Sequence, residues 1–133
     1  MVSQDEINRL FEAASAARDN AYAPYSNYAV GAAVLSGSGN IYSGCNVENA
    51  SYGAAICAER NAIGAFVNAG EKEMLVVAVC AFGEDYPFPC GICRQVMAEW
   101  GKDVIIFVFN ESGSRKEFLL SKLLPEAFTL KNT

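Results

Sequence analysis

The sequence contains no histidine, so neither a metal site nor a general base can be built from imidazole. Basic residues are also few, since ten Lys and Arg stand against fifteen Asp and Glu, with a net charge of −5 and a pI near 4.7. These basic residues do not form a run, which leaves no basic patch to neutralise phosphates. We therefore expect no nucleic-acid partner.

Long apolar runs are missing as well. No stretch approaches the roughly 20 residues of a membrane-spanning helix, so no membrane partner is expected. The N-terminus MVSQDEINRL is polar, whereas a secretory signal is basic and then apolar. These absences favour a cytoplasmic protein. Its five cysteines form an odd set, which in a reducing compartment indicates metal ligands, nucleophiles or core residues instead of disulfides.

Periodicity and turn residues predict where helices and strands begin and end. Ser3 and Glu6 have the spacing of a capping box and open a helix over residues 3–20, which ends before Pro24. The other expected elements are a hairpin of strands at 29–36 and 40–47, a helix at 56–70, a strand at 74–82, a helix at 91–100, a strand at 103–109, and a short strand with a short closing helix within 115–128.

The length and the order of these elements predict one domain that spans residues 1–133. The sequence contains no internal repeat, linker or low-complexity segment, and 52% of its residues are hydrophobic. A chain of this size buries roughly two-thirds of the surface that its unfolded form exposes. We expect an α/β fold, a three-layer sandwich in which about five strands form a mixed sheet with helices on both faces.

Two segments place cysteine at the start of a predicted helix. ICAER contains Cys57, and PCGICRQ contains Cys90 and Cys93. Backbone N–H groups and the positive end of the helix dipole favour a thiolate there. The three-residue spacing puts the sulfurs of Cys90 and Cys93 on one side of a helical turn, and adjacent β-α units bring both helix starts to one edge of the sheet. Three thiolates could then meet at one metal ion.

Three thiolates around Zn²⁺ leave the fourth tetrahedral position open, as in a catalytic zinc site. Glu59 lies two residues after Cys57, near enough to reach a water there without being a ligand. Such a glutamate could move a proton from water to substrate. Zinc deaminases combine these features: cysteine ligands, a nearby glutamate and a P-C-x-x-C segment.

The sequence closely resembles the small homotetrameric cytidine deaminases. The resemblance rests on ARDNAYAPYSNYAVGAAVL, YSGCNVENASYGAAICAER, PCGICRQV and LLPEAF, which follow in unbroken order over most of the chain. A P-C-x-x-C motif alone is a weak signal, because zinc ribbons and redox proteins share it. Cys57 of the CAE motif lies 33 residues before Cys90, and together with the upstream NVEN this makes the combination specific.

The resemblance implies that Cys57, Cys90 and Cys93 bind one Zn²⁺ per chain and that Glu59 transfers protons. Three thiolates give the zinc complex a negative charge, which weakens its pull on a bound water, so donors to the sulfurs are expected nearby. The residues expected to donate to the thiolates, as their counterparts in the family do, are Arg60 and Gln95.

For the substrate, the resemblance implies that Asn46 and Glu48 hydrogen-bond the ribose. An acceptor and an amide two residues apart on an extended segment point to the same side, which suits a neutral sugar. Tyr28 would pack on the pyrimidine, and the backbone N–H of Ala58 would contact the base. Neighbouring subunits would contribute Ala50, Tyr52 and Phe128. Two residues depart from the family pattern: Tyr28, often Phe, and Phe88, usually a small residue.

These residues predict a zinc-dependent cytidine deaminase that hydrolyses cytidine and 2′-deoxycytidine to the uridines and releases ammonia, a reaction of pyrimidine salvage. Two alternatives remain open: a zinc deaminase of a nucleoside-like antibiotic of the blasticidin S type, and a non-catalytic binding module stabilised by zinc. The Asn46 and Glu48 pair argues against the first, and Glu59 beside an open zinc position argues against the second. A thiol-disulfide enzyme is a third alternative, and it requires thiols that titrate freely without metal.

The assembly is predicted to be a homotetramer. Six tyrosines and eight phenylalanines are more aromatic surface than one small core readily hides, and the Gly- and Ala-rich segment GAAICAERNAIGAF can pack closely against copies of itself. The resemblance implies active sites that are shared between the subunits.

Overall fold

A computed structural model of the chain describes residues 2–130. Its elements are α1 (Gln4–Arg18), β1 (Val30–Ser36), β2 (Ile41–Cys45), the 3₁₀ turn η1 (Tyr52–Ala54), α2 (Ala58–Asn68), β3 (Met74–Ala81), α3 (Gly91–Met97), the 3₁₀ turn η2 (Ala98–Trp100), β4 (Ile105–Phe109), β5 (Arg115–Leu119) and α4 (Leu120–Leu123). The predicted element order is confirmed. The helix expected at 91–100 is shorter, because its last turn is η2, and η1 was not expected.

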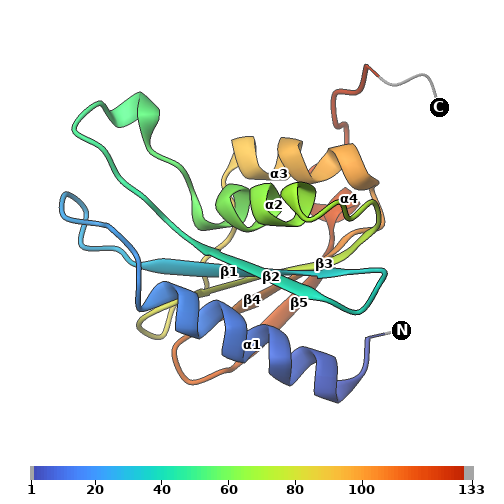
Figure 1. The fold of residues 1–133 in the computed structure, drawn as a ribbon, viewed down its shortest axis with the longest axis horizontal. Coiled ribbons are helices and arrows are strands. Elements are labelled where there is room, and N and C mark those ends of the chain that lie inside the picture. Colours follow the sequence, from blue (N-terminus) through green and yellow to red (C-terminus); the bar gives the residue numbers. More distant parts are fainter. Residues whose placement is uncertain (1, 131–133) are drawn as a thin grey trace.

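The five strands form one mixed sheet in the order β2-β1-β3-β4-β5. Strands β3 and β4 run parallel, and the other neighbouring pairs are antiparallel. Helix α1 covers one face of the sheet, and α2, α3 and α4 cover the other (Figure 1). The predicted three-layer sandwich is therefore confirmed. The predicted single domain includes residue 1 and residues 131–133, which lie outside the described residues. Among the described residues, no helix has the length and apolar character to cross a membrane.

Helix α1 begins where the capping box was expected. The Ser3 hydroxyl accepts a hydrogen bond from the backbone N–H of Glu6 (3.1 Å), and the Glu6 carboxylate accepts one from the backbone N–H of Ser3 (3.0 Å). Two N–H groups that have no partner inside the helix are satisfied in this way.

The core lies in two layers, one on each face of the sheet. The layer under α1 contains Leu10, Leu35 and Phe107, and the layer under α2 and α3 contains Phe66 and Met97, all buried. Strand β1 is buried along its whole length and β3 nearly so, which explains why both read as almost continuous apolar runs.

Two glycines allow helices to approach the sheet closely. A Cβ atom on Gly44 of β2 would lie 2.5 Å from the backbone nitrogen of Ala62 in α2. A Cβ atom on Gly31 of β1 would lie 1.8 Å from the carbonyl oxygen of Ala14 in α1. Both helices therefore rest directly on strand backbone, and the position of α2 depends on the missing side chain of Gly44.

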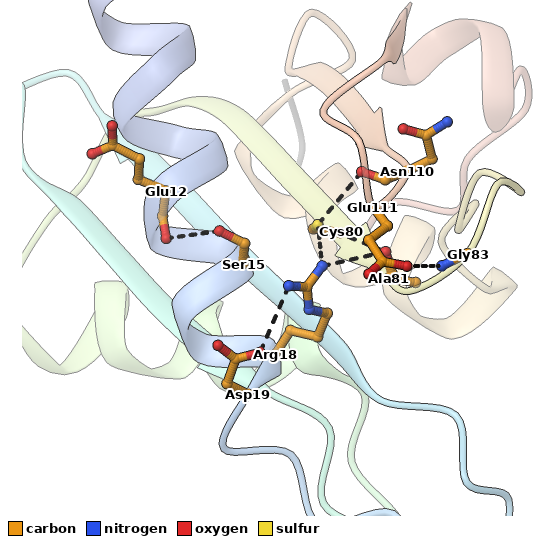
Figure 2. Close-up of polar contacts among 9 residues, drawn as sticks. All are labelled: Glu12, Ser15, Arg18, Asp19, Cys80, Ala81, Gly83, Asn110 and Glu111. Atoms are coloured by element: carbon orange, nitrogen blue, oxygen red, sulfur yellow. Dashed lines mark hydrogen bonds and ion pairs between the residues drawn. The ribbon is translucent and has the colours of Figure 1, made fainter.

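Cys80 belongs to the layer under α1. Its sulfur accepts a hydrogen bond from Arg18 Nη1 (3.3 Å), and the same guanidinium pairs with Asp19 (3.6 Å), as Figure 2 shows. Burial raises the pKa of the Cys80 thiol. Cys80 is thus a core residue on the face of the sheet opposite α2 and α3, as a cysteine inside an apolar strand is expected to be.

Candidate metal centre and active site

Three cysteine side chains meet where α2 and α3 begin. Cys57 is the N-cap residue of α2, Cys90 is the N-cap residue of α3, and Cys93 lies in the first turn of α3. Their sulfur atoms all lie within 4.8 Å of one another. The Sγ atoms of Cys57 and Cys90 are 3.8 Å apart, and those of Cys90 and Cys93 are 3.6 Å apart.

This group has the dimensions of a tetrahedral zinc site. Zn–S bonds of about 2.3 Å at tetrahedral angles separate two sulfurs by about 3.8 Å. The Cys57–Cys90 and Cys90–Cys93 sulfur distances are close to that value, and thiolates are ligands that Zn²⁺ favours. The residues therefore fit one zinc ion, and three protein ligands leave one position for substrate or water.

Arg60 lies against this group on α2. Its Nη2 atom is 3.6 Å from the sulfur of Cys57, and its Nε atom is buried without a hydrogen-bond partner in the described part of the chain. A hydrogen bond from Cys93 and then the Arg60 guanidinium lower the pKa of Cys57 to about 5. The same bond raises the pKa of Cys93. Negative charge on sulfur is therefore favoured at Cys57.

Glu59 is buried beside the cysteines. Only 4% of the Glu59 surface is exposed. Removal from water raises the pKa of its carboxyl group to about 7, and the negative charge of Cys57 adds to the effect. A carboxyl group with this pKa can accept a proton and return it near neutral pH. Perturbed carboxyl groups of this kind cluster at active sites.

Asn46 and Glu48 follow β2 and contact the loop at residues 24–28. Asn46 Nδ2 donates to the carbonyl oxygen of Tyr28 (2.8 Å), and its Oδ1 accepts from the backbone N–H of Val30 (2.9 Å). The Glu48 carboxylate accepts from the backbone N–H of Tyr25 (2.9 Å) and borders a cavity of about 320 Å³. Both side chains keep acceptor or donor capacity for a ligand.

Two further predicted site residues are Tyr28, which interacts electrostatically with Glu59, and Ala58, which follows Cys57. Burial raises the pKa of Tyr28, and the negative charges of Glu59 and Asp85 raise it further, so the phenol is within electrostatic reach of Glu59. Ala58 is the first residue of α2, directly after Cys57, where a backbone N–H has no partner within the helix.

The structure leaves three predicted site residues on the surface. Ala50 and Tyr52 belong to the segment between β2 and α2, which projects from the body of the protein (Figure 1), while Phe128 follows α4 near the C-terminus. Tyr52 is 78% exposed and Phe128 67%.

Gln95 contacts the segment that follows α4. Its Nε2 atom donates to the carbonyl oxygen of Phe128 (2.7 Å), and its Oε1 atom accepts from the backbone N–H of Phe128 (3.3 Å). One of the two N–H groups of the Gln95 amide is thus engaged by the C-terminal segment, and its role as a donor to the thiolates stays a prediction. The contact follows from the tertiary position of that segment, which passes within reach of α3.

Sequence reasoning missed two residues that hold this region together. Arg94 donates to the carbonyl oxygens of Pro89 (2.8 Å) and Leu123 (3.2 Å), and so ties the loop before Cys90 to α4. Ser26 donates to Glu48 and accepts from the backbone N–H of Tyr28. The turn-forming sequence PYSN was the available signal for Ser26, whereas nothing local indicates the partners of Arg94.

Comparison with known proteins decides the family. The sequence pattern described as the cytidine and deoxycytidylate deaminase zinc-binding region matches residues 4–109. The chain belongs to this deaminase family. It is 43% identical to the cytidine deaminase of Halalkalibacterium halodurans over 124 residues, which cover 92% of this chain and 94% of the relative. It is 41% identical to that of Sporosarcina psychrophila, over 93% of this chain and 92% of the relative.

Solved structures of cytidine deaminases share the fold. The crystal structure of the enzyme from Burkholderia pseudomallei matches with a TM-score of 0.85 and 45% identity, over 91% of this chain and 98% of that one. The enzyme from Mycobacterium tuberculosis matches with a TM-score of 0.77 and 38% identity, over 92% and 97% of the two chains. The three-cysteine group of this deaminase lies inside the segment matched by the zinc-binding pattern.

Proposed function

We propose that the protein hydrolyses cytidine and 2′-deoxycytidine to uridine and 2′-deoxyuridine with release of ammonia. The observation that carries this proposal is the buried carboxyl group of Glu59 beside three cysteine sulfurs spaced for one zinc ion. The relatives and solved structures reported above are cytidine deaminases, and neither the antibiotic deaminase nor the binding module is favoured.

Glu59 carries the proton transfers of the proposed mechanism. Zinc, when held by the three cysteines, supplies Lewis-acid activation of water. Glu59 accepts a proton as the water oxygen bonds to C4 of the base, and delivers it to N3. It then assists the second proton transfer, to the amino nitrogen, as the C4–N bond breaks, so that ammonia leaves and C4 keeps a carbonyl oxygen.

The other residues bind and orient the nucleoside. Asn46 and Glu48 hydrogen-bond the sugar hydroxyls, Tyr28 packs on the pyrimidine, and the backbone N–H of Ala58 contacts the base. This assignment is supported by the proximity of Tyr28 to Glu59 and by the cavity beside Glu48. Arg60 offsets the negative charge of the thiolates through its contact with Cys57.

The proposed assembly is a homotetramer in the cytoplasm, with residues 1–133 of each chain forming one catalytic domain. Ala50, Tyr52 and Phe128 reach the sites of neighbouring subunits. Their exposure in the single chain supports this arrangement.

Metal content and cytidine turnover measured on one purified sample test the proposal. We expect one zinc per chain, together with a loss of cytidine ultraviolet absorbance and release of ammonia. Zinc without turnover would support a binding module instead. Faster turnover of blasticidin S than of cytidine in a parallel assay would support the antibiotic deaminase.

A further inference from the structure

The hydroxyl group of Ser26 lies between two residues that the proposed function assigns to the substrate. It donates a hydrogen bond to Oε2 of Glu48 and accepts one from the backbone N–H of Tyr28 (3.0 Å). Both hydrogen-bonding roles of this hydroxyl are thereby used within the site. One side chain joins the proposed sugar-binding carboxylate to the aromatic residue proposed to pack on the base.

Ser26 also uses its backbone to hold Glu48. The Oε1 atom of Glu48 accepts from the backbone N–H groups of Tyr25 (2.9 Å) and Ser26 (3.1 Å), while Oε2 receives the Ser26 hydroxyl. These bonds lower the pKa of Glu48, the Ser26 hydroxyl contributing most. A carboxylate has about four acceptor positions, so the remaining capacity is on Oε2, where it can take a ligand hydroxyl.

The turn that follows Ser26 sets the backbone position of Tyr28. Asn27 has a φ of 57°, in the left-handed region that is uncommon for residues other than glycine. The Tyr28 backbone is then held on both sides, its N–H by Ser26 and its carbonyl oxygen by Asn46 (2.8 Å). Strained turns persist where surrounding bonds determine them, and here the bonds come from Ser26, Asn46 and Glu48.

We propose that Ser26 is a positioning residue whose hydroxyl couples sugar recognition by Glu48 to the placement of Tyr28 over the base. This inference rests on the proposed function. Loss of the hydroxyl removes the hydrogen bond to Oε2 of Glu48 and the one from the N–H of Tyr28, while the backbone bonds to Oε1 of Glu48 remain. Nucleoside binding weakens, while the cysteines, Glu59 and the chemical step are unaffected because Ser26 bonds to none of them.

Steady-state kinetics of the zinc-loaded enzyme test the proposal. We expect Ser26→Ala to raise KM for cytidine about tenfold while kcat changes less than about twofold, since the lost bond involves a charged acceptor. Ser26→Thr keeps the hydroxyl and should restore KM. Ser26→Cys introduces a weak hydrogen-bond donor of similar size and should give an intermediate KM. If the alanine variant does not fold, the cysteine variant tests the proposal in its place.

Ser15→Ala is the matched control. The Ser15 hydroxyl donates to the carbonyl oxygen of Glu12 in its own helix (3.2 Å), on the far face of the sheet (Figure 2). Its loss should leave KM and kcat unchanged. Coupling is measured by adding Ser26→Ala to Glu48→Gln, where we expect the serine change to raise KM much less than it does alone.

Three outcomes would overturn the proposal. The first is a wild-type KM in both the alanine and cysteine variants, and the second is a threonine variant that behaves like alanine. The third is a fall in kcat, a rise in KM and a loss of zinc together, which marks a general structural defect. If the wild-type enzyme deaminates cytidine and any of these results is found, the role of Ser26 is refuted and the proposed function stands. A zinc-loaded wild-type protein that neither binds nor deaminates cytidine refutes the proposed function as well.

Discussion

At the scale of single residues, the proposed chemistry depends on one carboxyl group kept out of water. Glu59 lies in the first turn of α2, and its burial raises its pKa to about 7. An exposed glutamate titrates near pH 4.3 and would hold a proton poorly at neutral pH. Burial thus gives a carboxyl group the proton-transfer range that imidazole has in other proteins, and this chain contains no histidine.

Glu59→Gln should therefore separate metal binding from turnover. The amide keeps the shape of the side chain but can neither accept a proton from water nor return it, so we expect kcat to fall by about 10² to 10⁴. Zinc content by atomic absorption and the circular dichroism spectrum should match those of the wild type. A variant that retains wild-type turnover would remove Glu59 from the mechanism.

Removal of the metal should reveal the thiolate at Cys57. After chelation, alkylation of Cys57 should persist as the pH falls and be lost only through about pH 5, because Cys93 and Arg60 lower its pKa to that value. An ordinary thiol loses its reactivity near pH 8.5. Arg60→Ala should move the midpoint upward, since the positive charge beside the sulfur is gone.

Mass spectrometry of the iodoacetamide adducts at each pH measures this midpoint. Cys80 is the internal control, because it is fully buried and its pKa is raised. It should stay unmodified while the protein is folded. A Cys57 midpoint near 8.5 in the metal-free wild type would contradict the assigned contacts.

At the scale of elements, the site is positioned by the close fit of α2 on β2. Gly44→Ala would place a methyl group 2.5 Å from the backbone of Ala62 and push α2, with Cys57 and Glu59, away from the sheet. We expect a loss of roughly 1–3 kcal/mol in the free energy of unfolding and a weaker affinity for zinc.

Gly31→Ala is the comparison, because it displaces α1, which carries no predicted site residue. It should destabilise the protein without changing the zinc affinity of the folded fraction. Denaturant titration and competition with a chelator measure the two quantities. Equal zinc affinity in the Gly44 and Gly31 variants would show that α2 does not set the metal geometry.

The elements could be predicted from the sequence because their signals are local. Ser3 caps α1 three residues before Glu6, and each helix that bears site cysteines begins at the cysteine that marks it. Side-chain partners distant in the chain could not be predicted. Gln95 and Phe128 are 33 residues apart, and Ser26 and Glu48 are 22 apart, so their contacts depend on how loops cross after folding.

At the scale of the whole molecule, the proposed assembly would cover exposed aromatic side chains. Phe128 is 67% exposed although both polar groups of its backbone are bound to Gln95. Burying a phenylalanine side chain stabilises the folded state by about 1.5–3 kcal/mol. The exposed ring of Phe128 does not contribute this free energy within its own chain. A neighbouring subunit that receives the ring would recover it.

Two variants should show whether Phe128 acts in a neighbouring site. Phe128→Ala should lower kcat/KM for cytidine with zinc content unchanged, because the ring is removed from a site whose metal is held by another chain's cysteines. Gln95→Leu should have a smaller effect of the same kind, since it releases the backbone that presents the ring but keeps the ring itself. Sedimentation at assay concentration gives the oligomeric state of each variant. A wild-type enzyme that is fully active as a monomer would refute shared sites, whereas a Phe128→Ala tetramer with unchanged kinetics would remove Phe128 from them, because the exposed ring would then have no part in substrate binding.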